Sequence, residues 1–179
     1  MTDALEIVPY DPRWPAEFAA ERARIAAALG ALALRIDHNG STSVPGLAAK
    51  PVIDIQVSVA RLAPLEPFEV PLTGIGYSHT PHPDDSFAPF FHRPERWPHT
   101  HHVHLVEAGG LEERKTLAFR DYLREHDEAA REYAELKRGL AGRFGAGGSD
   151  SREAYANAKT DFVVRISERA LAMGLPRGL

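Results

Sequence analysis

The apolar residues near the start of the chain first follow a helical spacing and then a strand spacing. Trp14, Phe18, Ile25 and Leu29 lie on one helical stripe. An Asp-Pro pair precedes this stretch and Gly30 follows it, so we expect a helix over residues 13–29. The next apolar residues alternate with smaller or polar ones, which predicts a strand through Leu32, Leu34 and Ile36.

Residues 53–59 alternate more clearly than any other segment. Successive side chains of a strand point to opposite faces, so the aliphatic residues of this segment share one face. The opposite face carries Asp54, Gln56 and Ser58. We therefore expect one face of this strand in the core and the other against polar surroundings.

The remaining elements are predicted to be two more strands and then helices. Prolines within residues 61–75 allow at most a short helix there. Aromatic and β-branched residues predict strands around 86–92 and 101–107, for a sheet of four or five strands. The C-terminal half is predicted to be helical and the fold class to be α/β (α+β), with helices over 110–125, 128–144 and 151–173.

Capping residues support the last two helices. Asp127 and Asp150 are the expected N-caps, and Glu153 has capping-box spacing from Asp150. Gly145 and Gly174 are the expected ends. Residues 145–151 are then a flexible connection between helices.

Composition narrows the class of protein. A chain of 179 residues without low-complexity stretches is expected to form a single domain over residues 1–179. Its formal net charge of −4 argues against a general nucleic-acid-binding surface, and the lack of cysteine excludes disulfides and thiolate metal sites. There is no secretory leader pattern and no apolar run of about 18 residues, so we expect a cytoplasmic protein with no membrane partner. The oligomeric state is left open.

Residues 38–51 form a loop with polar chemistry. Gly40, Ser41, Thr42 and Ser43 supply backbone amides and hydroxyls suited to phosphate oxygens, although an ordinary polar turn has the same composition. Asp54 follows on a rigid strand, and a metal-bound phosphate needs both parts. The alternative for Asp54 is pairing with an arginine, and Lys50 is equally consistent with a phosphate ligand or a solvated residue.

Histidines are concentrated, because seven of the nine lie within residues 79–104. His102 and His104 share a strand face and could reach the same side of the sheet as Asp54. Such a grouping would suit zinc or another transition metal. His99 and His101 are expected at the surface.

Two lysines interrupt apolar helical stripes. Lys137 and Lys159 must either extend to solvent or meet a partner, and Arg120 and Arg124 lie on the preceding helix. Extension to solvent and binding of an anionic ligand both remain open. No Walker motif, Gly-x-Gly-x-x-Gly motif or Gly-x-Ser-x-Gly motif is present, which excludes a P-loop kinase.

Several blocks of the sequence resemble the GrpB family. The main block is His38-Asn39-Gly40-Ser41-Thr42-Ser43-Val44-Pro45-Gly46-Leu47 followed by Lys50-Pro51-Val52-Ile53-Asp54-Ile55, with Asn39 where that family usually has Ile. Later blocks are His102-Val103-His104, 117–124, 133–137 and 155–159, and the opening Val8-Pro9-Tyr10-Asp11-Pro12 with Trp14 is also similar. The resemblance covers nearly the whole chain and is weakest over residues 61–90.

This resemblance implies a nucleotidyltransferase-like fold, a mixed sheet flanked by helices. In that fold a Gly-Ser loop holds nucleotide phosphates and strand carboxylates hold magnesium, roles that would fall to Gly40, Ser41 and Asp54. Gln56 stands where such proteins commonly place a second carboxylate, and His104 or Glu107 are the candidates to replace it. A related domain occurs attached to dephospho-coenzyme A kinases in some bacteria.

Three hypotheses follow. The first is a nucleotidyltransferase-like enzyme that uses a divalent metal and acts on a nucleotide or another phosphorylated small molecule. Mg or Mn is the first expectation for that metal, with Zn or another transition metal as the alternative. The second is a binding module that keeps the anion site but has lost turnover, with a possible link to coenzyme A metabolism. The third is a histidine-based transition-metal site. The candidate residues are Asp54 and His104 for catalysis, Asp54, Gln56, His102 and His104 for metal, and Gly40, Ser41, Thr42, Ser43, Lys50, Arg120, Lys137 and Lys159 for phosphate.

Overall fold

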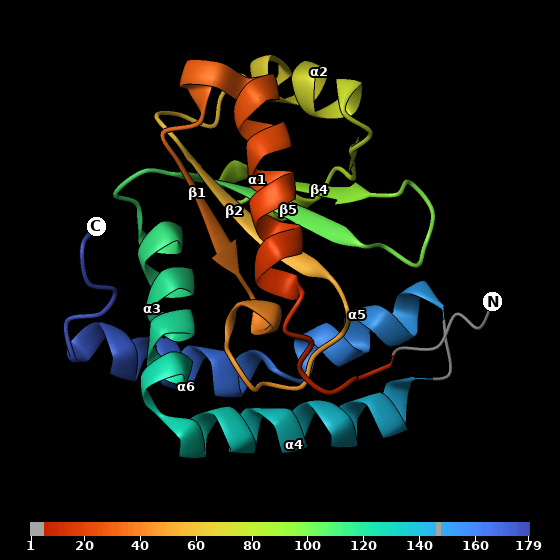
Figure 1. Cartoon of the computed structure of the whole chain (residues 1–179), viewed down its shortest axis with the longest axis vertical. Helices are drawn as coiled ribbons and strands as arrows, with labels where there is room; N and C mark the ends of the chain where they lie inside the picture. The colour runs from red at the N-terminus through yellow and green to blue at the C-terminus, as the bar shows by residue number, and fades with distance from the viewer. Residues whose placement is uncertain (1–5, 146–147) are drawn as a thin grey trace.

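The computed structural model describes residues 6–145 and 148–179, and these contain one mixed sheet of five strands (Figure 1). The strand order is β1-β2-β5-β4-β3. β2 and β5 run parallel, and the other neighbouring strands are antiparallel. The strands are β1 Arg35–Asn39, β2 Ile53–Val59, β3 Ser78–His79, β4 Phe90–Arg93 and β5 His101–Glu107.

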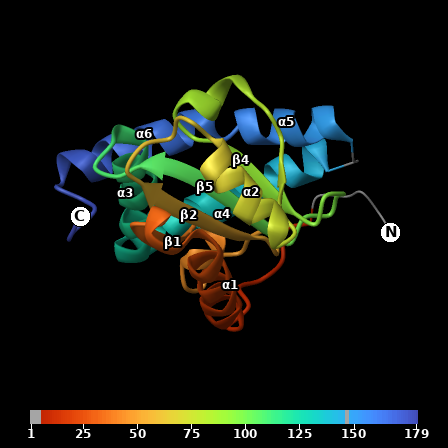
Figure 2. The ribbon, with the colours of Figure 1, turned by 90° about the horizontal axis from the view of Figure 1, so that it is seen from above.

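Helices cover both faces of the sheet. Figure 2 shows α1 on one side and α5 and α6 on the other. The helices are α1 Trp14–Leu29, α2 Glu66–Gly74, α3 Leu111–Glu125, α4 Asp127–Phe144, α5 Ser149–Asn157 and α6 Thr160–Ala172, with short 3-10 turns η1 Gly30–Leu32, η2 Ser41–Ser43 and η3 Pro83–Ser86. Within the described ranges, no helix combines the length and apolar character needed to cross a bilayer.

The two faces of β2 pack against different partners, as its alternation predicts. Its aliphatic residues are buried in a core shared with α1 and α2. On the polar face, Ser58 donates a hydrogen bond to Glu113 of α3 and Gln56 contacts Thr116 of α3. A second apolar core joins the loop after η2 to α3, α4 and α6. The site residues therefore lie where the sheet meets the C-terminal helices.

Most predicted elements are confirmed, including the short helix within 61–75, but several bounds were wrong. β1 begins at Arg35, because residues 30–32 form a 3-10 turn and the apolar side chains of Leu32 and Leu34 lie exposed. β4 begins at Phe90, after a 3-10 turn that occupies residues 83–86. The two-residue β3 is too short to leave a periodic pattern.

The C-terminal helical region differs most from expectation. The predicted helix 151–173 is divided into α5 and α6, because the backbone turns at Ala158–Lys159. His126 and Gly148 occupy the N-cap positions, so Asp127 lies inside α4 and Asp150 inside α5. Residues 146–147 of the expected connection lie outside the described residues.

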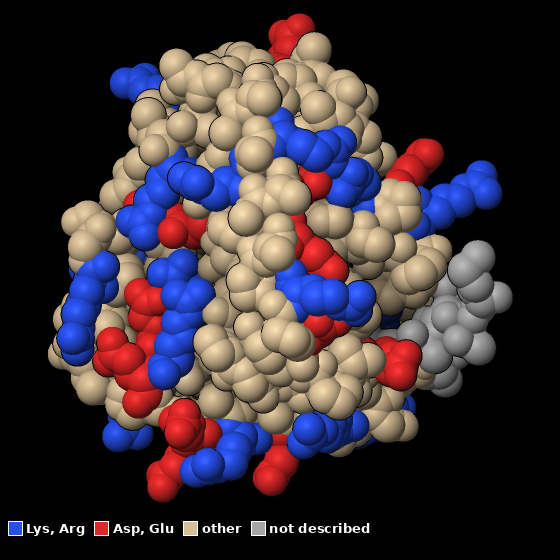
Figure 3. All heavy atoms as spheres, in the orientation of Figure 1, with Lys and Arg blue, Asp and Glu red and all other residues tan. Residues whose placement is uncertain are grey.

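Charges are mixed on the face shown in Figure 3, where lysine and arginine side chains alternate with aspartate and glutamate. This view shows no large surface of a single sign. Nucleic-acid backbones are bound by clustered basic residues, so this face does not have that character.

Candidate functional site

Gly40 brings the loop backbone directly against Asp54. β1 ends at Asn39, which is paired with Asp54 across the sheet, and Gly40 then adopts φ +64°. A Cβ at position 40 would lie 2.7 Å from the Asp54 Cβ and would overlap its carboxylate. Glycine is therefore required here both by the left-handed backbone and by the close approach.

The loop hydroxyls have different partners. Thr42 Oγ1 donates to the Val52 carbonyl at 3.1 Å and also contacts His38 Nε2, and Ser43 Oγ donates to the Gly40 carbonyl at 2.6 Å. These two hydroxyls hold the loop in shape. Burial raises the pKa of Tyr133 in α4, and the nearby Ser41 side chain opposes this rise.

Asp54 is an ionised carboxylate that lies beside His102 and His104. His102 Nδ1 donates to Asp54 Oδ1 at 3.1 Å, and His102 Nε2 lies 3.2 Å from His99 Nδ1. Desolvation raises the pKa of Asp54, but the His102 hydrogen bond and nearby positive charges outweigh it and lower the pKa to about 2. Burial lowers the pKa of His104 to about 4, so His104 is neutral at pH 7.

The other histidines are less exposed than expected. His99, predicted at the surface, is half-buried and stacks on His92 with ring centroids 4.0 Å apart. His101 is also half-buried, with its Nδ1 3.1 Å from Arg93 Nη2. Both are partly covered rather than fully exposed, because the sequence reveals neither the ring stacking of His99 nor the Arg93 contact of His101.

Gln56 is fully buried and only partly satisfied. One end of its amide contacts Thr116 Oγ1, and Asn39 Nδ2 lies 3.4 Å from the same end. The other end has no hydrogen-bond partner among the described residues. The unpaired end is notable because buried polar groups in proteins nearly always have partners.

The residues expected to bind metal do not form a ready-made metal site. Both ring nitrogens of His102 already have partners, and one end of the Gln56 amide is engaged by Thr116. Across residues 6–145 and 148–179, no group of three or more His, Asp or Glu side chains is arranged to hold an ion. Glu107 lies at the opposite end of β5 from His102 and accepts a hydrogen bond from the Leu62 amide, so it does not replace the missing acid.

Three lysines gather around Asp54. Lys137 is 2% exposed, donates to the Ala48 carbonyl at 2.5 Å and lies over the Tyr133 ring. Burial, followed by repulsion from Lys159, lowers the Lys137 pKa to about 7, while Asp54 opposes the change. Lys137 therefore does not extend to solvent.

Lys159 and Lys50 share this environment. Burial and then the charge of Lys50 lower the Lys159 pKa to about 8, and burial also lowers the pKa of Lys50. Asp54 acts in the opposite direction on both. No ion pair joins any of these lysines to a carboxylate in the described part of the chain. The site thus concentrates three ammonium groups around one carboxylate.

Arg120 lies apart from this group. Its guanidinium contacts the His38 carbonyl at 3.2 Å, Asp37 at 3.5 Å and Asp121 at 2.7 Å. These contacts join α3 to β1. Its charge is already balanced, so we do not include Arg120 among the phosphate ligands.

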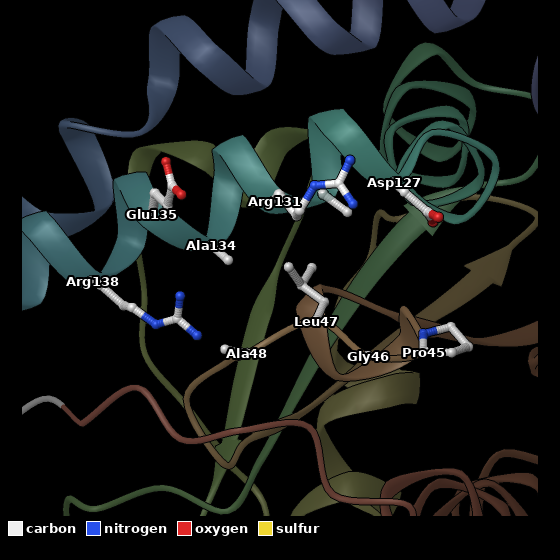
Figure 4. Close-up of a pocket in the computed structure, with 10 residues that line it drawn as sticks. Pro45, Gly46, Leu47, Ala48, Asp127, Arg131, Ala134, Glu135 and Arg138 are labelled. Atoms are coloured by element: carbon white, nitrogen blue, oxygen red, sulfur yellow. The ribbon is translucent and has the colours of Figure 1, made fainter.

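Two cavities border the site. One, of about 380 Å³, lies between α3, α4 and α6 and is lined by Gly40 and Tyr133. The other, of about 360 Å³, lies between the loop 45–48 and α4, where Arg131 and Arg138 are accompanied by two acidic residues (Figure 4). Of these two cavities, the first is the one lined by Gly40 itself.

Comparison with known proteins gives the same assignment as the sequence blocks. The family described as GrpB protein matches residues 4–169. The chain belongs to the GrpB family. The resemblance noted in the sequence is thereby confirmed, as is the mixed sheet flanked by helices.

Individual GrpB relatives cover most of the chain. A UPF0157 protein from Pseudomonas aeruginosa is 41% identical over 173 residues, which span 95% of this chain and 69% of that protein. The crystal structure of the conserved protein GrpB from Enterococcus faecalis is 31% identical with a TM-score of 0.83, over 96% of this chain and all of that one. A dephospho-CoA kinase from Mycolicibacterium paratuberculosis is 34% identical over 158 residues, 75% of this chain but 39% of the kinase.

Sequence reasoning missed two contributors to this GrpB site. Tyr133 lies near Ser41 and under the Lys137 ammonium. The Arg152 guanidinium lies over Trp97, and after burial its charge further lowers the pKa of Lys50. A signal for the tyrosine was present. Lys137 and Lys159 each follow a tyrosine by four residues, and each ammonium lies over that ring. No local pattern marks Arg152.

Proposed function

We propose that this GrpB-family protein binds a phosphorylated small molecule, with phosphate groups held by Lys50, Lys137 and Lys159 beside the Gly40 loop. The observation that carries the proposal is the excess of positive charge around Asp54, from buried Lys137 and half-buried Lys50 and Lys159. Concentrating three ammonium groups around one carboxylate is unfavourable in the empty protein, and the lowered lysine pKa values express this. A bound polyanion removes the repulsion. Perturbed groups of this kind cluster at functional sites.

Calorimetric titration with inorganic tripolyphosphate tests this proposal. Lys137→Met and Lys159→Met should each weaken binding by roughly 10–100-fold, as expected for loss of a charged hydrogen-bond donor. Arg22→Gln, on the exposed surface of α1, removes one positive charge outside the site and should leave the affinity unchanged. Citrate, a polyanion without phosphorus, separates phosphate binding from general anion binding. Equal tripolyphosphate affinity in all the variants would contradict the proposal.

A metal-dependent nucleotidyl transfer at the same site is the second candidate. It is favoured by one observation, the ionised Asp54 carboxylate that lies directly against Gly40. Because the described residues form no ready-made metal site, magnesium or manganese would arrive with the nucleotide. Titration of ATP with and without magnesium, in the parent and in Asp54→Asn, tests this candidate. If magnesium does not change ATP affinity in the parent, the candidate is dropped.

The ligand screen should also contain coenzyme A precursors. Some relatives are named dephospho-CoA kinase, and the matching part of one is 39% of that protein. We propose dephospho-coenzyme A as one phosphorylated compound to compare with nucleotides. Product analysis after incubation with magnesium then distinguishes an enzyme from a binding module.

A further inference from the structure

The indole ring of Trp97 contacts two positive charges that come from distant parts of the chain. The Lys50 ammonium lies 5.5 Å from the ring centroid, and the Arg152 guanidinium lies 4.7 Å from it. Trp97 belongs to the segment between β4 and β5, whereas Arg152 belongs to α5. The His99 ring packs against the same indole with centroids 5.2 Å apart. The indole is therefore held against Lys50, one of the three lysines around Asp54.

Two hydrogen-bond donors of this group have no acceptor. Trp97 Nε1 and Arg152 Nη1 are both buried, and neither has a hydrogen-bond partner among the described residues. A position over an aromatic ring stabilises a cation, but the N–H bonds of a guanidinium lie in its own plane and still need acceptors. Buried donors in folded proteins are nearly always paired. A bound molecule with acceptor atoms would complete both donors.

The charge around these donors favours an anion as that molecule. Arg152 forms no ion pair within the part of the chain that the structure describes. Arg165 also lies over an aromatic ring, but it is paired with Glu132 at 2.8 Å. Burial lowers the pKa of His99 to about 3, so this neighbour is neutral at pH 7. The charges of Arg152 and Lys50 are thus left for a ligand, and an oxyanion supplies both acceptor atoms and negative charge.

Lys50 connects this group to the lysine site. Burial lowers the pKa of Lys50, Asp54 opposes the change, and the charge of Arg152 adds to it. The charges that act on Lys159 are those of Lys50 and Asp54. Lys50 is therefore shared by the two groups, and Arg152 lies beyond it on the side away from Lys159.

We propose that Trp97 and Arg152, together with Lys50, form a second oxyanion subsite next to the phosphate site. This proposal rests on the phosphate site proposed above and specifies its ligand, a molecule with two oxyanion groups. One group is held by Lys137 and Lys159 and the other by Arg152. An arginine suits the outer position because its planar fork can bind two oxygens of one phosphate or carboxylate. A linear polyphosphate and a carbon compound phosphorylated at both ends share this chemistry.

Calorimetric titration with matched pairs of ligands tests the second subsite. The pairs are orthophosphate with tripolyphosphate, and fructose monophosphate with fructose bisphosphate. In at least one pair, the second ligand should bind the parent roughly tenfold or more tightly than the first. An advantage for tripolyphosphate alone identifies a phosphate chain, and an advantage for the bisphosphate alone identifies two separated groups.

Variants of the two unpaired donors show whether they cause this advantage. Arg152→Gln should reduce the advantage roughly tenfold and leave the affinity for the smaller ligand of the pair unchanged. Trp97→Phe keeps the ring and the net charge and removes only the N–H donor. It should reduce the advantage several-fold, and it tests the subsite even if Arg152→Gln fails to fold. Arg165→Gln removes an arginine from another aromatic ring, so it is the matched control and should keep the full advantage.

The outcomes separate the second subsite from the phosphate site. The subsite is wrong if neither larger ligand binds the parent more tightly than the smaller one, or if Arg152→Gln and Trp97→Phe both keep the full advantage. Equal weakening of both ligands of a pair by Arg152→Gln would also overturn it. Weaker orthophosphate binding by Lys137→Met supports the phosphate site whatever Arg152 does, whereas unchanged binding by that variant overturns the phosphate site itself.

Discussion

Replacing Lys137 by methionine should stabilise the empty protein at neutral pH. The side chain is almost fully buried, and its pKa falls from the ordinary 10.5 to about 7. A shift of this size corresponds to a cost of roughly 4–5 kcal/mol for folding with the lysine at neutral pH. Loss of the hydrogen bond to the Ala48 carbonyl offsets about 1–3 kcal/mol of the gain. We therefore expect a net stabilisation of about 1–4 kcal/mol, because methionine fills similar space without charge.

The pH dependence of the unfolding free energy shows whether the Lys137 charge is the cause of this stabilisation. A lysine whose pKa is lowered by folding binds more protons in the unfolded state, so the stability of the parent rises with pH above about 7. Methionine lacks this dependence. The advantage of Lys137→Met should thus shrink by about 3 kcal/mol between about pH 7 and about pH 9.5.

Urea unfolding of both proteins across this pH range measures the difference. Lys115→Met is the matched control, because Lys115 is 42% exposed and already paired with Glu112. It should show little change at any pH. A Lys137→Met variant that is destabilised equally from pH 6 to pH 9.5 would show that the buried ammonium does not destabilise the ligand-free protein, and this result would contradict the proposed anion site.

Three further predictions concern Asp54 and its neighbours. Asp54→Asn should lower the free energy of unfolding by about 1–2 kcal/mol near neutral pH. The difference from the parent should disappear between about pH 4 and pH 2, because the pKa of Asp54 in the folded protein is lowered to about 2. Urea unfolding over the acid range measures this difference. Gly40→Ala should cost about 2–4 kcal/mol by the same measurement, and more than Gly46→Ala, whose φ of +78° is similar but whose Cβ meets no atom within 4 Å. Gln56→Asp should destabilise the metal-free protein by about 3 kcal/mol, because it buries an unpaired charge. Magnesium or manganese should then raise the melting temperature of this variant more than that of the parent. Equal responses to the metal would remove Gln56 from any metal-binding role.

The sheet was predictable wherever one local pattern dominated. The strict alternation of β2 identified its buried and polar faces, and the structure confirms both. The start of β1 and the break between α5 and α6 were not predictable, because both depend on packing rather than on periodicity. Exposed Leu34 looks like a core residue in sequence, and no helix-breaking residue marks Lys159.

The candidate site was predictable in its centre and less so at its edges. A glycine followed by hydroxyl residues, and then a carboxylate on a strand, pointed to Gly40 and Asp54, which lie in contact. The hydrogen-bond partners of Thr42, Ser43 and Arg120 could not be predicted from the sequence in the same way. Each is fixed by a backbone carbonyl that only the folded chain brings near, so the sequence did not distinguish a ligand-binding group from one that supports the loop.

Lysine and arginine have different roles in this chain, and the difference supports an exchangeable ligand. The chain has 17 arginines and only four lysines, yet three of the four lysines surround Asp54. Buried Arg120 is balanced by two aspartates, whereas Lys137 and Lys159 lie over tyrosine rings. An arginine remains charged in any surroundings, but a buried lysine can release its proton when no anion is present and regain it when one binds. Lysines at these positions therefore allow the empty site to exist at moderate cost, and they link phosphate binding to proton uptake.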